Sequence, residues 1–436
     1  INLKTPMKTI LIISFMMLQG ILTNSYAQIT DPINNYKDYI ENEEVISENK
    51  LPAHASFTSF TSKDKALSNH AEYFKSLDGV WKFNWVKSPK DRPTTFMNPN
   101  TDVTGWNTIR VPANWEVEGY GIPIYVNHQY EFADYKAMIA DDMELEDGVY
   151  PKYPGKVPNN YNPVGSYRRE FTIDNDWGNK EIFLHIGTMK SGGFVWINGQ
   201  YVGYSQGSKL PAEFNITNAA KIGINTIAIQ IFRWTDGSYL ECQDFWRISG
   251  IERSVYIYAQ PKVRIQDFDV VSILDKGYEN GLFDISIEIK NHLEKKQKAQ
   301  LSYEVYNDND ELVVSNTKKI EVESGISVPI TFQSTIKNVK PWSAEHPNLY
   351  TLILELRNSK GKVLEATTRK IGFRSVEIKN GLLLVNGQRI TLKGVNAQEA
   401  DPETGHVMSE DMILKDIRLW KENNINAVRL SHYPRG

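Results

Sequence analysis

Short apolar runs that alternate with polar residues dominate the chain between residues 51 and 260. Residues 80–86 (VWKFNWV) place apolar side chains at every second position, as expected for a half-buried strand. Residues 193–203 predict two short strands around Asn198 and Gly199, a pair that favours a two-residue hairpin turn. Further strands are predicted at residues 181–186, 226–234 and 254–258. Many strands with few helices predict a jelly-roll sandwich for this region.

A second set of strand patterns follows between residues 261 and 373. The predicted strands are residues 263–271, 282–290, 299–306, 311–322, 327–332, 349–356 and 363–371. Seven strands in a region of this length are typical of an immunoglobulin-like sandwich. Pro261 precedes the first strand, and Gly372 follows the last. The pattern therefore predicts a second all-β unit.

After residue 373 the pattern becomes that of a strand, a helix and a strand. Residues 390–395 predict the first strand. Ser409 is a suitable N-cap for a helix that carries Ile413 and Ile417 on one face. Residues 427–430 predict the second strand. This arrangement within about 45 residues has the size of one βαβ unit.

Polar residues follow both of these strands. In a parallel barrel, the residues just past the strand ends line the active face. Asn396, Glu399 and His432 occupy such positions. They are therefore candidates for a functional site if the unit belongs to a barrel.

Residues 1–27 have the composition of upstream residues followed by a secretory signal. Lys8 supplies a positive start, residues 10–22 are largely apolar, and Ser25 and Ala27 place small residues before a cut. A signal anchor is the alternative, although the apolar run is short for a membrane span. No cysteine stands directly after the cut, which argues against a lipid anchor, so we expect no stable membrane anchor. We expect a secreted or periplasmic protein in which residues 28–50 form an extended N-terminal segment.

Composition narrows the class of protein. Of the 436 residues, 41% are hydrophobic and 23% are charged, which is ordinary for a soluble globular protein. The net charge of −4 and the pI of 6.1 argue against a basic surface for nucleic acid or an anionic membrane. Cys242 is the single cysteine, so no disulfide can form within the chain. The 10 tryptophans and 22 tyrosines suit both sugar stacking and large sheet cores, and composition leaves both interpretations open.

Three motifs carry the chemical information. VPANWEVEGYGIPIYVN spans residues 111–127, and RWTDGSYLECQDFWRISGIER spans residues 233–253. KGVN at residues 393–396 and NINAVRLSHYP at residues 424–434 form the third. Together these motifs resemble glycoside hydrolase family 2, in its large β-galactosidase subgroup. The order of the three predicted regions is also the order found in that family.

The resemblance implies a multidomain, mainly β fold: a jelly-roll sugar-binding domain, an immunoglobulin-like β-sandwich and the start of a (β/α)8 TIM barrel. The corresponding ranges are 51–260, 261–373 and 374–436. The family's enzymes are retaining glycosidases that use two glutamates, an acid/base and a nucleophile. A barrel of this type needs roughly 250 residues, so both glutamates are expected beyond Gly436 and no catalytic residue is expected within this chain. On this interpretation, residues 28–436 alone should not turn over substrate.

The resemblance assigns substrate contacts to one residue in each of the first two motifs. Asn114 corresponds to a loop asparagine that hydrogen-bonds galactose, and an amide can pair with two neighbouring hydroxyls. Its alternative is an ordinary asparagine turn after a proline. Asp244 corresponds to an aspartate that binds sugar and a sodium ion, a role that suits an oxygen ligand. Its alternative is a salt bridge with Arg233 or Arg247.

The third motif supplies further candidates. His432 corresponds to a family histidine that contacts substrate and helps to stabilise the transition state. Arg429, two residues earlier, and Asn396, at the end of the preceding strand, would support the site around it.

The chain departs from the family pattern at residues 397–400. The family commonly has Arg-His-Glu-His after KGVN, whereas this chain has Ala-Gln-Glu-Ala. Gln398 stands at the position of a histidine that contacts the transition state, and a glutamine can bond a hydroxyl but cannot carry a positive charge. Glu399 is expected to support the site near a metal or the substrate rather than to catalyse.

The function implied by the resemblance is hydrolysis of terminal non-reducing β-D-galactose residues, with retention, from an oligosaccharide or glycan. The alternatives are a β-glucuronidase or β-mannosidase of the same family, or an inactive carbohydrate-binding fragment. The family implies sodium and magnesium ions but no organic cofactor, and it allows a homo-oligomer at full length. The sequence contains no Gly-rich phosphate loop and no zinc-type Cys/His spacing.

Overall fold

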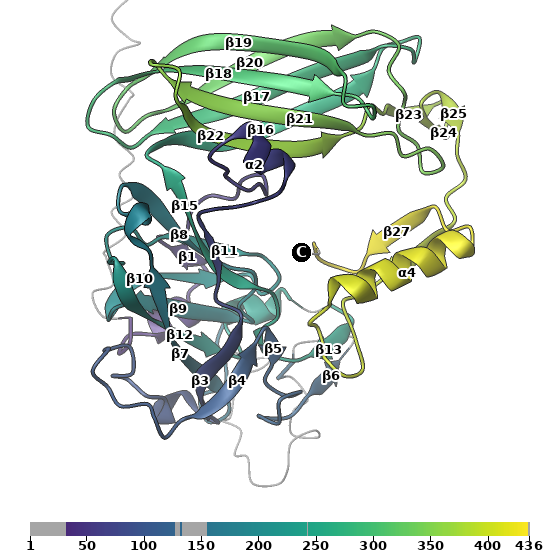
Figure 1. Cartoon of the computed structure of the whole chain (residues 1–436). Helices are drawn as coiled ribbons and strands as arrows, with labels where there is room; N and C mark the ends of the chain where they lie inside the picture. Colours follow the sequence, from purple (N-terminus) through teal and green to yellow (C-terminus); the bar gives the residue numbers. More distant parts are fainter. Residues whose placement is uncertain (1–31, 127–130, 133–154, 242, 435–436) are drawn as a thin grey trace, which may run out of the picture.

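The structure is a computed structural model that describes residues 32–126, 131–132, 155–241 and 243–434. The described part holds two antiparallel β-sandwiches and a smaller C-terminal segment, so the predicted mainly β fold is confirmed (Figure 1). None of its helices is long and apolar enough to span a membrane. The predicted signal at residues 1–27 lies outside the described residues.

The first sandwich packs a seven-stranded sheet against a four-stranded sheet. In spatial order, the larger sheet holds β1 (Ser47–Glu48), β10 (Gln200–Gln206), β9 (Gly192–Ile197), β12 (Gly223–Phe232), β7 (Val164–Ile173), β3 (Gly79–Val86) and β4 (Asn107–Val111). The smaller sheet holds β11 (Ala212–Asn215), β8 (Lys180–Ile186), β15 (Val255–Pro261) and β2 (Phe74–Ser76). Because successive side chains of a strand point to opposite faces, Ile227 and Ile229 of β12 share one core with Leu184 and Ile186 of β8.

The N-terminal segment differs from the expectation of an extended chain at residues 28–50. Within it, α1 (Lys37–Ile40) forms a short helix, and β1 pairs with β10. Tyr39 and Ile40 are each 1% exposed and join a core with Trp196 and Trp234. Burial of these two side chains holds the segment against the sandwich, because removal of apolar surface from water is favourable. This burial stabilises the segment although most of its other residues are polar.

The second sandwich has the seven strands that the sequence predicts. Its three-stranded sheet holds β16 (Val263–Leu274), β17 (Gly281–Asn291) and β20 (Ser327–Ile336). Its four-stranded sheet holds β19 (Leu312–Val322), β18 (Gln297–Tyr306), β21 (Tyr350–Asn358) and β22 (Val363–Ile371). Alternate residues of β17 and β18, such as Ile285, Ile287, Leu301 and Tyr303, are buried between the sheets.

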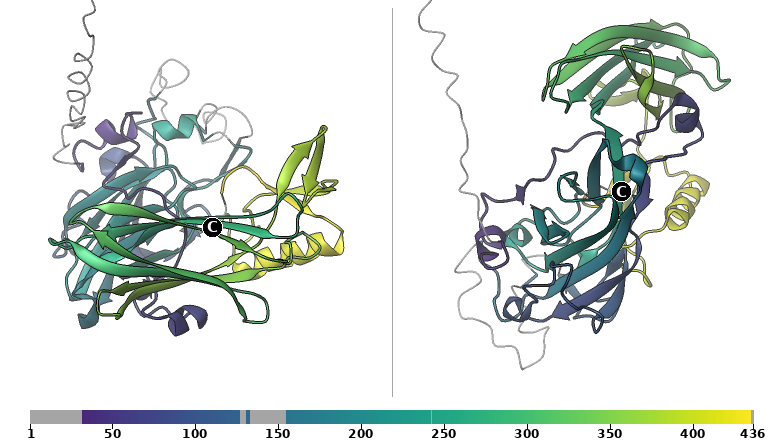
Figure 2. Two further views of the ribbon diagram at one scale, coloured as in Figure 1. Left: turned by 90° about the horizontal axis from the view of Figure 1, so that it is seen from above. Right: turned by 60° about the vertical axis from the view of Figure 1, so that its left-hand side comes forward.

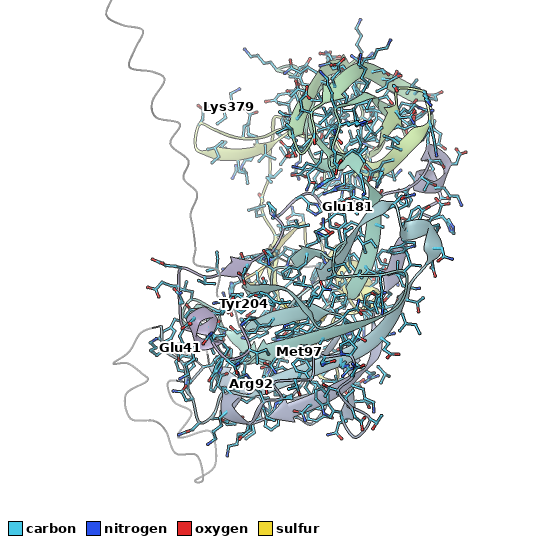
Figure 3. The ribbon with its side chains drawn as sticks, turned by 90° about the vertical axis from the view of Figure 1, so that its left-hand side faces the viewer. Glu41, Arg92, Met97, Glu181, Tyr204 and Lys379 are labelled. Carbon is cyan, nitrogen blue, oxygen red and sulfur yellow. The ribbon has the colours of Figure 1, made fainter. Side chains whose placement is uncertain are left out.

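The two sandwiches are in direct contact. Lys262 alone separates β15 from β16, and Glu365 of β22 accepts hydrogen bonds from Gln260 Nε2 at 2.8 Å and from the Ile265 amide at 2.7 Å. Glu181 lies where the two sandwiches meet (Figure 3). Its carboxylate lies 3.7 Å from His292 Nδ1. The helix α2 (Lys63–Leu67) covers part of β22, and Ser62 caps its first turn (Figure 1). These contacts place the second sandwich against one end of the first.

The C-terminal segment lies beside the first sandwich (Figure 2). It holds a small antiparallel sheet, β23 (Val376–Lys379), β24 (Leu382–Val385) and β25 (Gln388–Arg389), and then a βαβ unit. The unit consists of β26 (Gly394–Ala397), α4 (Glu410–Glu422) and β27 (Ala427–Leu430), with β26 parallel to β27. Ser409 accepts a hydrogen bond from the Met412 amide at 3.3 Å, which confirms the predicted N-cap.

The first strand of this unit starts later than the predicted residues 390–395. The chain still belongs to the preceding small sheet at β25, and the amide of Ile390 donates to the carbonyl of Leu383 at 3.2 Å. These backbone groups are therefore paired with β24 and are not available to β27.

A prediction follows from the close approach of β7 to the first motif. A Cβ added at Gly165 would overlap the ring of Trp115 and would lie 2.9 Å from the ring of Phe83. We expect Gly165→Ala to destabilise the protein by about 1–3 kcal/mol, because overpacking forces buried rings off their preferred positions. Gly105→Ala is the control, since no atom lies within 4 Å of its added Cβ. Chemical denaturation of both variants measures the difference, and equal stabilities would contradict the tight packing.

Candidate functional site

Four short strands bring the first two motifs together on the side of the first sandwich that meets the C-terminal segment (Figure 1). β5 (Ala113–Asn114) pairs with β14 (Gly250–Ile251), and β6 (Ile124–Val126) pairs with β13 (Phe245–Arg247). Gly250 has a φ of +125°, and a Cβ there would lie 2.5 Å from the carbonyl oxygen of Ala113. The glycine therefore permits this close pairing.

Asp244 directly precedes β13 and is exposed. Its Oδ1 accepts a hydrogen bond from the Tyr125 hydroxyl at 2.6 Å. The rings of Tyr125 and Trp246 lie 5.6 Å apart and are 45% and 50% exposed. A carboxylate beside two exposed aromatic rings is a composition that suits a sugar, because the rings offer apolar faces and the carboxylate accepts hydrogen bonds.

Gln398 joins Asp244 from the C-terminal segment. Its Nε2 donates to the backbone carbonyl of Asp244 at 2.9 Å. The structure thus brings together two predicted site residues that are 154 positions apart in the sequence. Sequence reasoning missed Tyr125 and Trp246, although both lie within the motifs. Trp246 is two positions from Asp244, so alternation along a strand could have placed it on the same face, whereas only the pairing of β6 with β13 brings Tyr125 to this face.

The remaining polar candidates of the third motif lie at the ends of β26 and β27. Arg429 Nη1 lies 3.4 Å from Asn396 Oδ1 and 3.3 Å from Ser431 Oγ, and both Arg429 and Asn396 are exposed. His432 is also exposed. Glu399, in contrast, is 5% exposed, and both of its carboxylate oxygens accept from Arg253 Nη2, at 3.1 and 3.0 Å.

Five charged side chains are buried behind the second motif. Each is at most 2% exposed, and we call them the Glu131 cluster: Glu116, Glu131, Lys190, Arg233 and Arg247. The carboxylate of Glu131 lies 2.6 Å from Lys190 Nζ and 4.0 Å from nitrogens of Arg233 and Arg247. Burial by itself raises the pKa of Glu131, but the three cations outweigh burial and hold the pKa below its ordinary value.

The Glu131 cluster decides between two interpretations of Asp244. Arg233 Nη1 lies 3.1 Å from Glu116, and Arg247 faces Glu131. Among the described residues Asp244 has no ion pair. The alternative of a salt bridge between Asp244 and either arginine is therefore wrong, and its carboxylate remains exposed.

Asn114 is fully buried in this structure. Its Nδ2 donates to the Ser249 carbonyl at 3.2 Å and to Glu252 Oε1 at 3.0 Å, and its Oδ1 accepts from the His406 amide at 2.8 Å. The amide thus joins the first sandwich to the C-terminal segment. Its predicted contact with galactose stays a prediction, because here these protein groups occupy the amide.

The partners of Asn114 belong to a buried group that sequence reasoning missed. Lys209, Glu252 and His406, which we call the Glu252 cluster, are each at most 8% exposed. Burial by itself raises the pKa of Glu252, but Lys209 and His406 outweigh burial and hold it well below its ordinary value. Glu252 lies within the second motif, but no sequence signal joined it to Lys209 and His406, because the three residues come from three separate loops.

Asp244 is also the residue to which the resemblance assigns a sodium ion. Its exposed carboxylate provides oxygen donors of the kind that hard cations prefer, so the residues present fit such an ion. Within the described ranges, no group of three or more His, Cys, Asp or Glu side chains is placed to hold a metal ion.

Comparison with known proteins identifies the family. The chain matches "Glycosyl hydrolases family 2, sugar binding domain" over residues 74–261, "Glycosyl hydrolases family 2" over 263–374 and "Glycosyl hydrolases family 2, TIM barrel domain" over 376–436. The chain therefore belongs to glycoside hydrolase family 2, as the three motifs predicted.

Two relatives show how much of such a protein is present. A protein named "Beta-galactosidase" from Priestia megaterium is 40% identical over 412 residues, which cover 93% of this chain and 38% of the relative. A "Beta-galactosidase" from Streptococcus thermophilus is 36% identical over 397 residues, which cover 91% of this chain and 36% of the relative. The chain thus spans less than two fifths of the length of these relatives.

Solved structures share the fold. A β-glucuronidase from Bacteroides uniformis superposes with a TM-score of 0.68 at 22% identity, covering 83% of this chain and 40% of that chain. A β-glycosidase from Bacteroides vulgatus gives 0.63 at 22% identity, covering 83% and 42%. At this identity the comparison supports the fold and does not select an activity.

The Glu131 cluster yields a stability prediction. Glu131→Ala leaves Lys190, Arg233 and Arg247 buried without their shared carboxylate, so we expect a loss of about 3–5 kcal/mol in the free energy of unfolding. Glu118→Ala is the control, because Glu118 pairs at 3.3 Å with Arg110, whose side chain is 76% exposed. An exposed pair of this kind contributes at most about 1 kcal/mol. Denaturant unfolding measures the loss of stability in both variants. Similar losses would show that Glu131 is not needed to stabilise the buried cations.

His406 and His54 should make the stability of the protein depend on pH in opposite directions. Burial lowers the pKa of His406 below 6.5, so its contribution to stability is present above pH 6.5 and is lost as the pH falls through the lowered pKa. A hydrogen bond to Glu213 raises the pKa of His54 above 6.5, so its contribution is present below pH 6.5 and is lost as the pH rises through the raised pKa. We expect His406→Gln to reduce the fall of Tm on acidification and His54→Gln to increase it. Thermal unfolding across this pH range measures both slopes, and slopes that change in the same direction would contradict the assignment.

Proposed function

We propose that this chain is part of a β-galactosidase that hydrolyses terminal β-D-galactosides with retention. The relatives named "Beta-galactosidase" support this activity, because they align with more than nine tenths of the chain at 36–40% identity. The observation that carries the proposal is the joining of Asp244, Tyr125 and Gln398 from three separate segments. This arrangement provides hydrogen-bonding groups beside exposed aromatic rings, as a pyranose requires.

In this proposal the residues of the chain bind and orient the sugar. The Asp244 carboxylate accepts hydrogen bonds from sugar hydroxyls. It would also hold a sodium ion, which would supply a positive charge to sugar oxygens. Gln398 supports Asp244 by donating to the backbone carbonyl of Asp244, and His432 lies past the end of β27 on the same segment. Two carboxylates about 5 Å apart perform the retaining reaction in such enzymes; neither belongs to the residues assigned here.

Gln398 distinguishes the proposed sugar site from that of the family, in which a histidine is common at this position. A histidine at its position could carry a positive charge toward the transition state, whereas the glutamine amide is neutral. We therefore propose that the site recognises galactose mainly by hydrogen bonds around Asp244, without a positive charge at position 398. Secretion or export to the periplasm is a separate proposal, supported by the composition of residues 1–27.

The proposal is tested with the full-length protein. We expect it to hydrolyse an aryl β-galactoside in preference to an aryl β-glucuronide, and proton NMR of the first product should show the β anomer. Preference for the glucuronide would show that the protein is a β-glucuronidase of the same family instead. Absence of hydrolysis of any aryl β-glycoside would favour an inactive carbohydrate-binding protein.

Asp244→Asn tests the assigned binding group. Loss of the charge should lower kcat/KM for the aryl β-galactoside about tenfold or more, because hydrogen bonds to a charged group contribute about 1.5–3 kcal/mol. It should also weaken any dependence of the rate on sodium concentration. Asp269→Asn is the control, because Asp269 is an exposed carboxylate on β16 of the second sandwich. Equal kcat/KM values for Asp244→Asn and the unaltered protein would remove Asp244 from the site.

A further inference from the structure

The Glu252 cluster occupies the contact between the first sandwich and the C-terminal segment. Lys209 lies in the loop between β10 and β11, Glu252 follows β14, and His406 precedes α4. The Lys209 ammonium forms an ion pair with Glu252 Oε2, and His406 Nδ1 lies 2.9 Å from Glu252 Oε1 and 3.1 Å from Lys209 Nζ. One carboxylate therefore joins two segments of the first sandwich to the loop that leads into α4.

Backbone contacts fix this loop further. The amide of His406 donates to Asn114 Oδ1 at 2.8 Å, while Asn114 Nδ2 donates to Glu252 Oε1 at 3.0 Å. Gly405 has a φ of +67°, and a Cβ there would lie 2.6 Å from Asn114 Oδ1. The loop therefore approaches the first sandwich as closely as a glycine permits.

The Glu252 cluster also packs against Phe245 and Tyr433, whose neighbours in sequence are the proposed sugar-binding residues Asp244 and His432. The His406 ring lies 5.3 Å from the ring of Phe245, which follows Asp244. The Lys209 ammonium lies 4.6 Å from the ring of Tyr433, which follows His432. Phe245 and Tyr433 lie 5.4 Å apart. A displacement of the cluster would thus move the backbone on both sides of the site.

Arg253 connects the same parts through its guanidinium. Nη1 donates to the Lys209 carbonyl at 3.1 Å, and Nη2 donates to Glu399 and, at 2.7 Å, to the Pro434 carbonyl. Pro434 follows Tyr433 directly. Two independent sets of bonds therefore join the first sandwich to the segment that carries Gln398 and His432.

General stabilisation is a weak reason for such a cluster. Replacement of buried ions by well-packed apolar residues is often neutral or stabilising, because desolvation opposes the attraction between the charges. Directional hydrogen bonds, in contrast, fix the relative positions of the groups that they join. A buried carboxylate with three partners from three separate segments suits positioning better than it suits stability.

We propose that Lys209, Glu252 and His406 are positioning residues that set the separation between Asp244 and His432, and hence the fit of the galactoside. This inference rests on the proposed function, since that function makes Asp244 and His432 the sugar-binding groups. The three residues act through Phe245 and Tyr433 and do not touch the sugar.

Glu252→Gln in the full-length protein is the test, with Glu213→Gln as its matched control. Glu213 is also a buried carboxylate of the first sandwich that pairs with a histidine, with His54 Nε2 at 2.7 Å, but it lies in β11 and has no contact with Phe245 or Tyr433 among its hydrogen bonds and ion pairs within the described residues. Both variants remove one buried charge. We expect only Glu252→Gln to raise the Kd for a non-hydrolysable aryl thiogalactoside, by about tenfold, which corresponds to about 1.4 kcal/mol.

A second measurement is independent of activity. Amide hydrogen exchange at residues 243–247 and 431–433 should become faster in Glu252→Gln and remain unchanged in Glu213→Gln, because only the former loosens the chain around Phe245 and Tyr433. His406→Asn is a second variant in case Glu252→Gln does not fold. It keeps a hydrogen-bonding group near the place of Nδ1 but removes the ring that packs on Phe245, so it should show the same faster exchange.

The outcomes separate the two proposals. Faster exchange together with a higher Kd supports the positioning role. Exchange and Kd values that change equally in Glu252→Gln and Glu213→Gln, or in neither, overturn it. If the unaltered protein binds no thiogalactoside, the proposed function fails, and hydrogen exchange alone then decides whether the cluster fixes these two segments.

Discussion

The attraction of three buried cations to the carboxylate of Glu131 is the interaction on which the rest of the site depends. Arg233 is the first residue of the second motif, Arg247 lies 14 positions later within it, and Lys190 precedes β9. Charged groups in a protein interior need partners, because they have lost their hydration. Because Glu131 and Glu116 pair with these cations, Arg233 and Arg247 are held in place. The segment between the two arginines is therefore fixed at both ends.

A consequence of these fixed ends is the exposure of Asp244. Because both neighbouring arginines turn inward to glutamates, the aspartate between them keeps a carboxylate that faces outward with Tyr125. A sequence with two arginines close to an aspartate allows a local salt bridge as well. The interior charge balance of the first sandwich excludes that pairing and leaves Asp244 able to bind a ligand.

The contact between the first sandwich and the C-terminal segment includes several polar pairs. Arg253 with Glu399, Asn114 with His406, and Gln398 with Asp244 each join residues more than 140 positions apart. Polar contacts of this kind are directional, so they define a single relative placement where apolar surfaces alone would allow sliding. The second sandwich packs against the other end of the first, through Glu365 and Gln260, and carries none of these groups.

The sequence by itself determined the fold class, the order of the three regions and the family, because strand periodicity, turn residues and long motifs are local features. It also determined that Ser409 begins a helix and that Asp244 and Gln398 are candidates for one site. Only the tertiary structure decided that Asn114 is buried, that Arg233 and Arg247 turn away from Asp244, and that Lys209, Glu252 and His406 meet. These outcomes depend on which charges become neighbours after the sheets pack, and a residue's neighbours in space are not encoded in its neighbours along the chain.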